Sequence, residues 1–449
     1  MPLATGRGDW WAALNDPAID RLVGRSLAAS PTLEEALARV DQARAQLAGD
    51  RAAQRPQLVL NGGVTTGNSA SVDTEGATPR ASGLHTTSAT IGPSLSWEVD
   101  LWGRLREQAS AARSRLDART ADAAAARLSV AAQIADAVVV LRACRLSLAI
   151  RDRDIASRGT ELAVARARLA FGNIAPADVA ATETNLAAAR TDRIATDATC
   201  RRATNLLVAL TGEDFAAVEA AIAAPLPAAG PDLVASMPVA PVARPGLPAT
   251  VLLNHPGVVA AEREVAARWS EIAVSRAARL PRLNLGAVLS GQWLGALGGS
   301  VGYSSWSAGP DFSVPLYDGG AGGAGIRLSQ GRYREAVATL AETLRRAGQD
   351  IEDALVDQQS AIDRATTARA AVTAAGFTLR ANEARWRAGA IAAFQLEASR
   401  RDFDAAQDGA VTAARDRARA WIQLVRATGA VPTDSPDMKT KPATEREFQ

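Results

Sequence analysis

The sequence predicts a mainly helical fold with a small β part, built as two copies of one succession of elements. Three observations predict this class. Ala dominates a hydrophobic fraction of 47%, whereas aromatic residues make up only 4%, a balance that favours long packed helices over a thick mixed core. Two runs of helical character are far too long for a globular domain. Short segments with alternating apolar and polar residues precede each of these runs.

The composition excludes several classes of protein. Lys and Arg number 50 and Asp and Glu 48, a net charge of +2, which is too small a basic excess for general binding of nucleic acid. Two His and two Cys cannot build a zinc framework or a disulfide scaffold. The sequence also lacks a nucleophile elbow, a P-loop and a dinucleotide fingerprint. We therefore expect no enzyme, no metal site and no cofactor.

The internal repeat is visible as like motifs at constant spacing. Pro56 recurs as Pro281, each at the end of a predicted helix. Three later landmarks share a single, slightly shorter spacing: Gly92-Pro93 with Gly309-Pro310, Gly172 with Gly389, and Thr211-Gly212 with Thr428-Gly429. Such regular spacing over most of the chain indicates duplication. The change of spacing adds about eight residues to the first copy, in the Ser/Thr/Gly-rich segment 68–84, which we expect to be an exposed loop.

Each copy is expected to contain a helix, two strands, a long helix and a shorter helix. The predicted ranges are 32–53, 57–66, 86–101, 104–171 and 175–210 in the first copy, and 257–278, 282–292, 302–317, 320–388 and 392–427 in the second. The predicted domains are an N-terminal extension at 1–29, repeat 1 at 30–212, an inter-repeat linker or equatorial segment at 213–254, repeat 2 at 255–429, and a flexible C-terminal tail at 430–449.

The lengths of these elements restrict the architecture. At ~1.5 Å per residue each long helix spans roughly 100 Å, so it must lie along another helix as in a coiled coil. Gly172 and Gly389 interrupt the helical pattern and are predicted as the hairpin turns. Four amphipathic strands cannot close a membrane barrel, which needs at least about eight, so closure requires several copies of the chain. The alternative is two separate β-hairpins, each packed on its own helices.

No membrane-spanning helix and no signal peptide are expected. Residues Met1 to Trp11 contain no apolar core of the kind a signal peptide needs. The sequence has no uncharged apolar stretch of about 18 residues. The most apolar piece, 220–243, is interrupted by Pro and Gly and is interpreted as a linker.

The repeat, the element order and the local motifs together resemble the outer membrane factor (TolC-like) family of Gram-negative efflux and secretion systems. Within it the chain is most similar to the lipoprotein channel branch that serves resistance-nodulation-division pumps. The matching motifs run from about residue 9 to 430: Trp10-Trp11, Asn15-Asp16-Pro17, the Ala-rich segment Leu33 to Leu47, Trp97 to Arg104, Val314 to Gly320, Ile351 to Leu355, and Arg385 to Gly389.

The resemblance implies a homotrimer. Three chains, each giving four strands, would form a twelve-stranded barrel in the lipid of the outer membrane, continued by a helical coiled-coil tunnel in the periplasm. A periplasmic adaptor and an inner-membrane pump would be its partners. The implied function is passive conduction of small molecules, such as drugs or other toxic compounds, out of the cell. Members of this branch usually start the mature chain with a lipidated Cys, whereas the first Cys here is Cys144. Either the sequence begins after the signal peptide and the anchor, or this member has no anchor.

Two alternatives to a drug-efflux channel stay open. Within the family, the chain could be the outer-membrane conduit of type I protein secretion, although the Trp10-Trp11 region and the paired Gly-Pro strands favour the pump branch. From another class, it could be a soluble coiled-coil scaffold. A scaffold has no need for an apolar, aromatic-flanked face on four strands, so the strands discriminate the two.

The resemblance also implies a periplasmic gate near the hairpin turns. The family holds acidic and polar residues just after the turn glycine, and Asp178 and Glu397 are the candidates here. Trp386, in the place of a common aromatic, and Arg387 complete the set. Three acidic side chains converging on an axis repel one another and attract cations. The alternative is that Asp178 and Glu397 are solvated surface charges, with Asp178 favourably placed in a first helical turn.

Aromatic residues at strand ends suggest the membrane boundary. Trp97, Trp102, Trp293 and Trp306 lie in or beside the predicted strands, and barrels of the outer membrane carry aromatic girdles at both interfaces. Ordinary packing between strands is the alternative.

The two cysteines lie at matching distances from the first turn. Cys144 lies as far before Gly172 in the sequence as Cys200 lies after it. In an antiparallel hairpin the two would stand at the same height, and the periplasm favours oxidation. A disulfide therefore requires only that both side chains point inward, since helix axes 8–10 Å apart otherwise keep the Cα atoms too distant. Two buried free thiols are the alternative.

Overall fold

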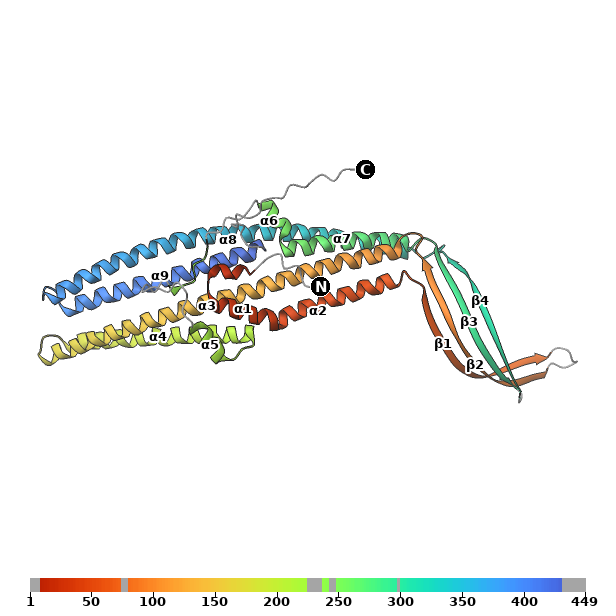
Figure 1. The fold of residues 1–449 in the computed structure, drawn as a ribbon, viewed down its shortest axis with the longest axis horizontal. Helices are drawn as coiled ribbons and strands as arrows, with labels where there is room; N and C mark the ends of the chain where they lie inside the picture. Colours follow the sequence, from red (N-terminus) through yellow and green to blue (C-terminus); the bar gives the residue numbers. More distant parts are fainter. Residues whose placement is uncertain (1–8, 74–79, 224–235, 242–247, 297–298, 430–449) are drawn as a thin grey trace. The chain divides into compact units, whose positions relative to one another are not determined.

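The computed structural model describes residues 9–73, 80–223, 236–241, 248–296 and 299–429 (Figure 1). The chain is mainly helical with one four-stranded sheet, as the sequence predicts. The elements of the first half are η1 (Trp10–Leu14), α1 (Pro17–Ala29), α2 (Pro31–Ala52), β1 (Gln57–Asp73), β2 (Arg80–Val99), α3 (Arg104–Ala170), α4 (Pro176–Thr211) and α5 (Phe215–Ala223). Those of the second half are α6 (Pro248–Asn254), α7 (Pro256–Ala277), β3 (Arg282–Ala296), β4 (Gly299–Ser313), α8 (Ala321–Arg387) and α9 (Ala393–Thr428).

Several predicted segments fall partly or wholly outside the described residues. The predicted tail at 430–449 is entirely outside, and so are parts of the predicted N-terminal extension, loop and linker: 1–8, 74–79, 224–235 and 242–247. The predicted loop at 68–84 is wrong at both ends, because β1 continues to Asp73 and β2 begins at Arg80. Its described residues, Asn68 to Asp73 and Arg80 to Leu84, lengthen a strand pair whose backbones bond to each other, and this pairing outweighs their turn preference.

The chain divides into two units. The first contains residues 1–37, 121–259 and 342–449, and the second contains 38–120 and 260–341. Each unit takes segments from both sequence repeats, and α2, α3, α7 and α8 contribute residues to both units.

The sheet of the second unit is antiparallel throughout, in the order β1-β2-β3-β4 (Figure 1). β2, the last strand of the first repeat, pairs with β3, the first strand of the second, over two stretches from Thr86↔Ala296 to Val99↔Leu283. The alternative of two separate β-hairpins, each packed on its own helices, is therefore wrong. Main-chain bonding between β2 and β3 satisfies donors and acceptors that two separate hairpins would leave unpaired.

The register places most of the large apolar side chains of the four strands on the same face, with Val59, Val288, Leu294 and Val301 as exceptions. On this face Leu60 of β1 lies opposite Pro93 of β2. On the same face Leu289 of β3 lies opposite Trp306 of β4. The opposite face is polar and is linked by side-chain hydrogen bonds, among them Asn61 to Ser94 at 2.8 Å and Ser290 with Ser305 at 3.0 Å. Members of the apolar face remain largely exposed: Leu58, Leu60, Val64, Ile91, Leu289, Trp306 and Phe312. Nothing within the described chain covers this face.

Each second strand ends earlier than predicted, for a local reason. β2 ends at Val99, and the Asp100 carboxylate accepts hydrogen bonds from the backbone N–H of Leu105 and Arg106 in the first turn of α3. These donors have no partner within a helix, so Asp100 acts as its cap. β4 ends at Ser313, shortly before Pro315, which has no N–H to offer a ladder.

Four helical segments pack together in the second unit. Gln108 on α3 donates to Asp50 on α2 at 2.7 Å, and Arg115 on α3 is paired with Glu271 on α7. Trp269 on α7 lies 5.4 Å from Tyr333 on α8, measured between ring centroids. Polar ties and one aromatic pair thus hold these Ala-rich helices in a fixed rotation about their axes.

The first unit contains two antiparallel hairpins, α3–α4 and α8–α9, and the main hydrophobic core (Figure 1). The N-terminal residues belong to this core. Trp10 stacks near Trp421 of α9 with centroids 5.7 Å apart, and Leu14 and Ile19 are fully buried. Residues 9–29 of the predicted N-terminal extension are therefore a packed part of the unit.

A buried ion pair fixes the N-terminal segment on α3. Asp16, with no exposed surface, accepts hydrogen bonds from Nε of Arg142 at 2.5 Å and from Nη2 at 2.7 Å, and it also caps α1 by accepting the N–H of Ala18. The remaining Arg142 nitrogen donates to the carbonyl of Ile222. Bidentate geometry and filled hydrogen bonds are what make such a buried pair tolerable. The Asn15-Asp16-Pro17 motif is thus explained by packing.

One window of 18 residues within α3 is apolar enough to cross a membrane by composition and length, and 50% of it is buried inside the protein. Residues of α3 between Ala131 and Ala143 belong to the hydrophobic core of the first unit. We interpret the window as a core segment, whereas no stretch of this length and composition was expected from the sequence.

Candidate functional site

The candidate site is the region of the first unit around the two hairpin turns. At the first turn, Gly172 has a φ of +72°, and the N–H of Asn173 bonds back to the carbonyl of Arg168 at 2.9 Å. At the second, Gly389 has a φ of +69°, and the N–H of Ala390 bonds to the carbonyl of Arg385 at 2.8 Å. Left-handed glycines with such back-bonds are the common way to end a helix. Both glycines thus lie where each hairpin reverses.

Asp178 has a clear local role at the first turn. Its carboxylate accepts the backbone N–H of Ala175 at 3.0 Å, where α4 begins, and its side chain is exposed. An acid in a first helical turn is also favoured by the helix dipole. The local role explains an acid at this position without reference to a gate.

The second turn replaces this acid by a neutral residue. Gln395, the counterpart of Asp178 in the second repeat, accepts the N–H of Ala392 at 3.2 Å through its side-chain oxygen. The same cap is therefore kept with a neutral amide on a side chain one methylene longer. A gate made of these positions has one charged and one neutral ring.

Glu397 is buried, with 3% of its surface exposed. One carboxylate oxygen accepts a hydrogen bond from Ser157 on α3, and the other pairs with Arg400 at 2.8 Å. The alternative of a solvated surface charge is therefore wrong for Glu397, since α3 covers this side of α9.

Asp178 and Glu397 line the same groove. Its volume is about 390 Å³, and it lies beside α3, the start of α4 and the start of α9. The exposed aromatic ring of Phe394 forms part of its wall, with Arg168 and Glu161 among the charged groups. Two residues that the sequence places far apart are thus brought together at one hollow.

The other two candidates do not line this groove. Trp386 precedes the second turn and is 47% exposed. Arg387, also exposed, lies 3.8 Å from Glu383 one turn earlier on the same helix. Neither residue contacts Asp178 or Glu397 through any described hydrogen bond or ion pair.

A ladder of polar contacts joins α3 to α9, and sequence reasoning missed it. The rungs, in order along α3, are Asp136 with Arg419, Ser147 and Arg151 with Asp408, Arg153 with Asp404, Ser157 with Glu397, and Glu161 with Arg401. The signal was present in the sequence as charged residues of α9 at intervals of three and four, which share one helix face. The ladder holds the first hairpin against the second.

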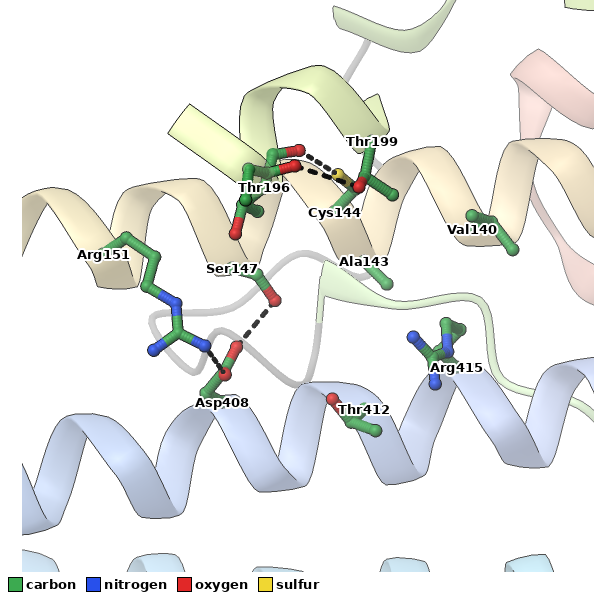
Figure 2. Close-up of a pocket in the computed structure, with 11 residues that line it drawn as sticks. Val140, Ala143, Cys144, Ser147, Arg151, Thr196, Thr199, Asp408, Thr412 and Arg415 are labelled. Carbon is green, nitrogen blue, oxygen red and sulfur yellow. Dashed lines mark hydrogen bonds and ion pairs between the residues drawn. The ribbon is translucent and has the colours of Figure 1, made fainter. Parts of the chain in front are cut away.

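Figure 2 shows the central rung. Asp408 on α9 points at Ser147 and Arg151 on α3, with oxygen to oxygen and oxygen to nitrogen distances of 2.7 and 2.8 Å. These residues border a hollow of about 330 Å³ beside Cys144. One rung away, burial raises the pKa of the Asp404 carboxyl, and nearby Arg153 opposes this shift.

The structure contains a disulfide between Cys144 and Cys200. Their Cα atoms are 5.6 Å apart, and both residues are buried between α3 and α4. The short Cα separation arises because both side chains point into the hairpin. The second repeat has Ala361 and Arg417 at the corresponding positions, so this covalent tie exists in one hairpin alone among the described residues.

The four tryptophans of the sheet region lie at different levels. Trp97 donates to the carbonyl of Gln54 at 3.1 Å and Trp102 to that of Pro281 at 2.7 Å, where strands meet helices. Trp293 lies toward the other end of β3, well beyond Leu285, the partner of Trp97. This separation is roughly 27 Å along the strand. Trp306 lies between these levels, opposite Leu289.

No group of three or more His, Cys, Asp or Glu residues that could hold a metal ion occurs among the described residues. The polar groups of the candidate site are engaged in caps and in the contacts between hairpins. The arrangement provides positioning and charge.

Long helical hairpins joined by polar rungs, together with an amphipathic sheet whose edge strands have no partner among the described residues, are typical of a channel-forming protein that assembles from several copies. The family model described as outer membrane efflux protein matches residues 22–213 and 247–430, and the chain belongs to this family.

Individual relatives agree with this assignment. The chain is 28% identical over 427 residues to outer membrane protein OprJ of Pseudomonas aeruginosa, covering 94% of this chain and 86% of that protein. It is 27% identical over 348 residues to the solvent efflux pump outer membrane protein SrpC of Pseudomonas putida, covering 76% and 70%. The structure of the open state of the Neisseria gonorrhoeae MtrE outer membrane channel is similar in fold, with a TM-score of 0.76, 23% identity, and coverage of 93% and 90%.

Proposed function

We propose that the chain is the outer-membrane exit channel of a tripartite efflux system and that it conducts small molecules passively. The single observation that carries this proposal is the sheet. Most of its large apolar side chains lie on one face, that face is exposed, and both edge strands lack a partner in the described chain. In water this surface would aggregate, whereas in a closed barrel it would face lipid and the polar face would line a wet lumen.

Three copies are the assembly that the strand number favours. Four strands per chain give twelve in a trimer, an even number within the range of outer-membrane barrels. The spacing of Trp97 and Trp293 supports a barrel, because roughly 27 Å along a strand is close to the ~25 Å apolar band that aromatic girdles flank. Trp97, Trp102 and Trp293 would then occupy the two interfaces, and Trp306 would face the lipid between them.

The hairpin turns are proposed as the periplasmic gate and as the docking site for the adaptor and pump. Asp178 and Glu397 share a groove there, and Phe171, Phe394 and Trp386 expose aromatic rings nearby in the chain. Exposed apolar rings beside charges are typical of a surface that binds protein. SrpC is named for solvent efflux, and we propose small apolar or amphipathic toxic compounds as the cargo here, with energy supplied by the pump.

The mass of the purified protein, measured by light scattering in mild detergent and in buffer alone, tests the assembly. We expect a trimer that persists in detergent. A planar bilayer containing this trimer should then show discrete conductance steps. A monomer or dimer that remains soluble without detergent, with no conductance, would overturn the channel proposal in favour of a soluble scaffold.

A further inference from the structure

A hollow of about 610 Å³ lies in the second unit, where α7 passes into β3 and β4 passes into α8 (Figure 1). Cavities of this size hold drug-sized molecules. Its wall contains two arginines, an acid and several small residues, among them Arg279, Arg282, Asp318, Ser313, Val314 and Gly322. Neither arginine side chain has a hydrogen bond or an ion pair with another residue of the described chain.

The hollow exists because three positions of its wall carry small residues. Their counterparts in the first repeat, at the shorter of the two repeat spacings, are larger: Trp97 for Val314, Leu105 for Gly322, and Gln108 for Gly325. Leu105 is buried, and Gln108 bonds to Asp50 of α2 at 2.7 Å. The space that these side chains occupy in the first repeat is therefore left open in the second.

The first repeat also has neutral residues where the hollow has cations. Gln54 is the counterpart of Arg279, and Gln57 is that of Arg282, at the longer repeat spacing. The side chain of Gln54 donates a hydrogen bond to the carbonyl of Leu105 at 3.1 Å. The first repeat thus uses its polar side chain within the junction, whereas the second presents two guanidinium groups to the hollow.

The hollow opens on the polar side of the sheet. β3 and β4 pair without interruption from Arg282↔Ser313 to Ala296↔Gly299, so side chains alternate strictly along both strands. Arg282 therefore shares its face with Ser290, which belongs to the hydrogen-bonded polar face. Ser313, opposite Arg282, lies on this face too, and both residues line the hollow.

Asp318 is the acid of the wall, and its carboxylate is engaged by α8. Its two oxygens accept the N–H groups of Gly322 and Gly320, each at 2.8 Å. These bonds, with a smaller contribution from Arg279, hold the pKa of the Asp318 carboxyl below its ordinary value. The positive end of the α8 dipole lies at the same place. Two arginines against one capped aspartate leave an excess of positive charge in the hollow.

We propose that this hollow binds the anionic group of a drug-sized organic molecule as it passes from the helical tunnel into the barrel. The inference rests on the proposed function, since a closed barrel turns the polar face of the sheet toward the lumen. Guanidinium groups bind oxyanions through paired, charge-assisted hydrogen bonds. A lipid phosphate has the same chemistry, but lipid would meet the opposite, apolar face of the sheet.

The wall of the hollow also suits an apolar ring. The aliphatic stem of Arg279 lies so close to Gly322 that a Cβ there would be 2.9 Å from its Cγ. Ala278, Val314 and Pro315 add further apolar surface. The site therefore fits an amphipathic anion, with its ring against this surface and its charged group on the arginines. A trimer would carry three such sites.

Binding of two matched probes to the purified trimer in a neutral detergent tests the site. The probes, 2-naphthalenesulfonate and 2-naphthalenesulfonamide, share a ring system and differ in charge. Isothermal titration calorimetry measures each against a detergent blank. We expect the wild type to bind the sulfonate. In Arg279→Gln/Arg282→Gln, which restores the residues of the first repeat, the sulfonate affinity should fall about tenfold or more, because the charge-assisted bonds are lost. Binding of the sulfonamide should not change.

Two further variants separate the hollow from its charge. Val314→Trp restores the counterpart Trp97 and fills the space while both arginines stay, so it should lose the sulfonate as well. Arg334→Gln/Arg345→Gln removes the same charge from exposed positions of α8 and should bind the sulfonate like the wild type. The first repeat accommodates the introduced residues at the equivalent positions, and trimer mass and melting temperature check that each variant is folded.

The outcomes separate the site from the channel. If the wild-type trimer does not bind the sulfonate, or if Arg279→Gln/Arg282→Gln binds it equally well, the site is wrong and the channel proposal stands. Phosphatidylglycerol that the wild type retains in native mass spectrometry and the arginine variant loses, without sulfonate binding, would assign the hollow to a lipid phosphate and overturn the solute. A wild type that is no trimer in detergent contradicts the proposed function itself, and with it the position of the hollow in a lumen.

Discussion

At the scale of single residues, the charged groups of the helical hairpins serve mainly to tie one helix to another. Asp16 and Arg142 are both buried and satisfy each other through two hydrogen bonds. Asp404 is different, because it is buried on α9 with one arginine, Arg153, at 3.1 Å and a second acid, Asp154, adding repulsion. Its charge is therefore the less well compensated of the two acids.

The titration of Asp404 gives a prediction with a defined sign. Because burial raises its pKa, the folded chain retains the proton at pH values where the unfolded chain has lost it. The stability from this group is thus complete below the ordinary pKa of an aspartate and declines as pH rises through the folded value. Asp404→Asn stays neutral at every pH. We expect its melting temperature, relative to the wild type, to be higher at pH 7 than at pH 4.

Differential scanning calorimetry at the two pH values measures this difference. Glu342→Gln is the matched control, since Glu342 is exposed and pairs only weakly with Arg346 along its own helix; its relative melting temperature should not change with pH. If the substitution Asp404→Asn instead lowers the melting temperature more at pH 7 than at pH 4, the stabilisation from the ion pair with Arg153 is larger than the cost of burying the Asp404 charge.

At the scale of elements, the two hairpins have the same turns and differ in their covalent tie. The disulfide of the first hairpin closes a loop with a sequence separation of 56 residues, which corresponds to about 4 kcal/mol in the chain-entropy model. Reduction should therefore loosen α3 and α4 far more than α8 and α9. Hydrogen exchange with and without reductant measures this, and we expect faster exchange around Cys144 and Cys200.

The second hairpin is the internal control for this experiment. Ala361 and Arg417 occupy the corresponding positions, so exchange in α8 and α9 should be unaffected by the reductant. Equal acceleration in both hairpins would indicate that the disulfide acts on the whole unit. Unchanged exchange in α3 and α4 would mean that packing of the Ala-rich helices alone holds the first hairpin.

Helices and strands were predictable at this scale because each has a strong periodic signal. The prediction for the first long helix was 104–171, and the structure has Arg104–Ala170. The strand pair β1–β2 was predicted too short, because Ser, Thr and Gly at 68–84 satisfy a turn pattern locally, whereas strand pairing is decided by the neighbouring backbone. The pairing of β2 with β3 could not be predicted, since it depends on contacts between the two repeats.

The candidate site was predictable only in part, because some of its features are local and others depend on contacts between distant segments. The turn glycines and the capping acid Asp178 are local features and are visible in the sequence. The burial of Glu397 against Ser157 and the ladder between α3 and α9 depend on how two hairpins meet. The charges of α9 at intervals of three and four indicated a face, but not what covers it.

At the scale of the whole molecule, the charge at the hairpin turns should determine the ion preference of the channel. Asp178 is exposed, and its counterpart in the second repeat is the neutral Gln395. In a trimer the first position supplies three negative charges and the second supplies none. A ring of acids at a constriction concentrates cations and repels anions.

Asp178→Asn removes this ring and retains an oxygen that can cap α4, so the hairpin should remain folded. We expect the ratio of potassium to chloride permeability to fall by about twofold or more, with trimer mass unchanged. The reversal potential in a salt gradient across a planar bilayer measures the ratio. Glu342→Gln, an exposed acid on α8 away from the turns, serves as the control and should leave it unaltered.

The response of the permeability ratio to ionic strength distinguishes an acid at a narrow gate from an acid on an open surface. At a narrow ring the acids are only partly screened, so the difference between wild type and Asp178→Asn should persist at about 0.1 M salt, where the Debye length is ≈ 10 Å. If the difference disappears there, or if the variant equals the wild type at every salt concentration, Asp178 faces open solvent. Its role would then be limited to the cap of α4, and the constriction would have to be formed by other residues of the turns.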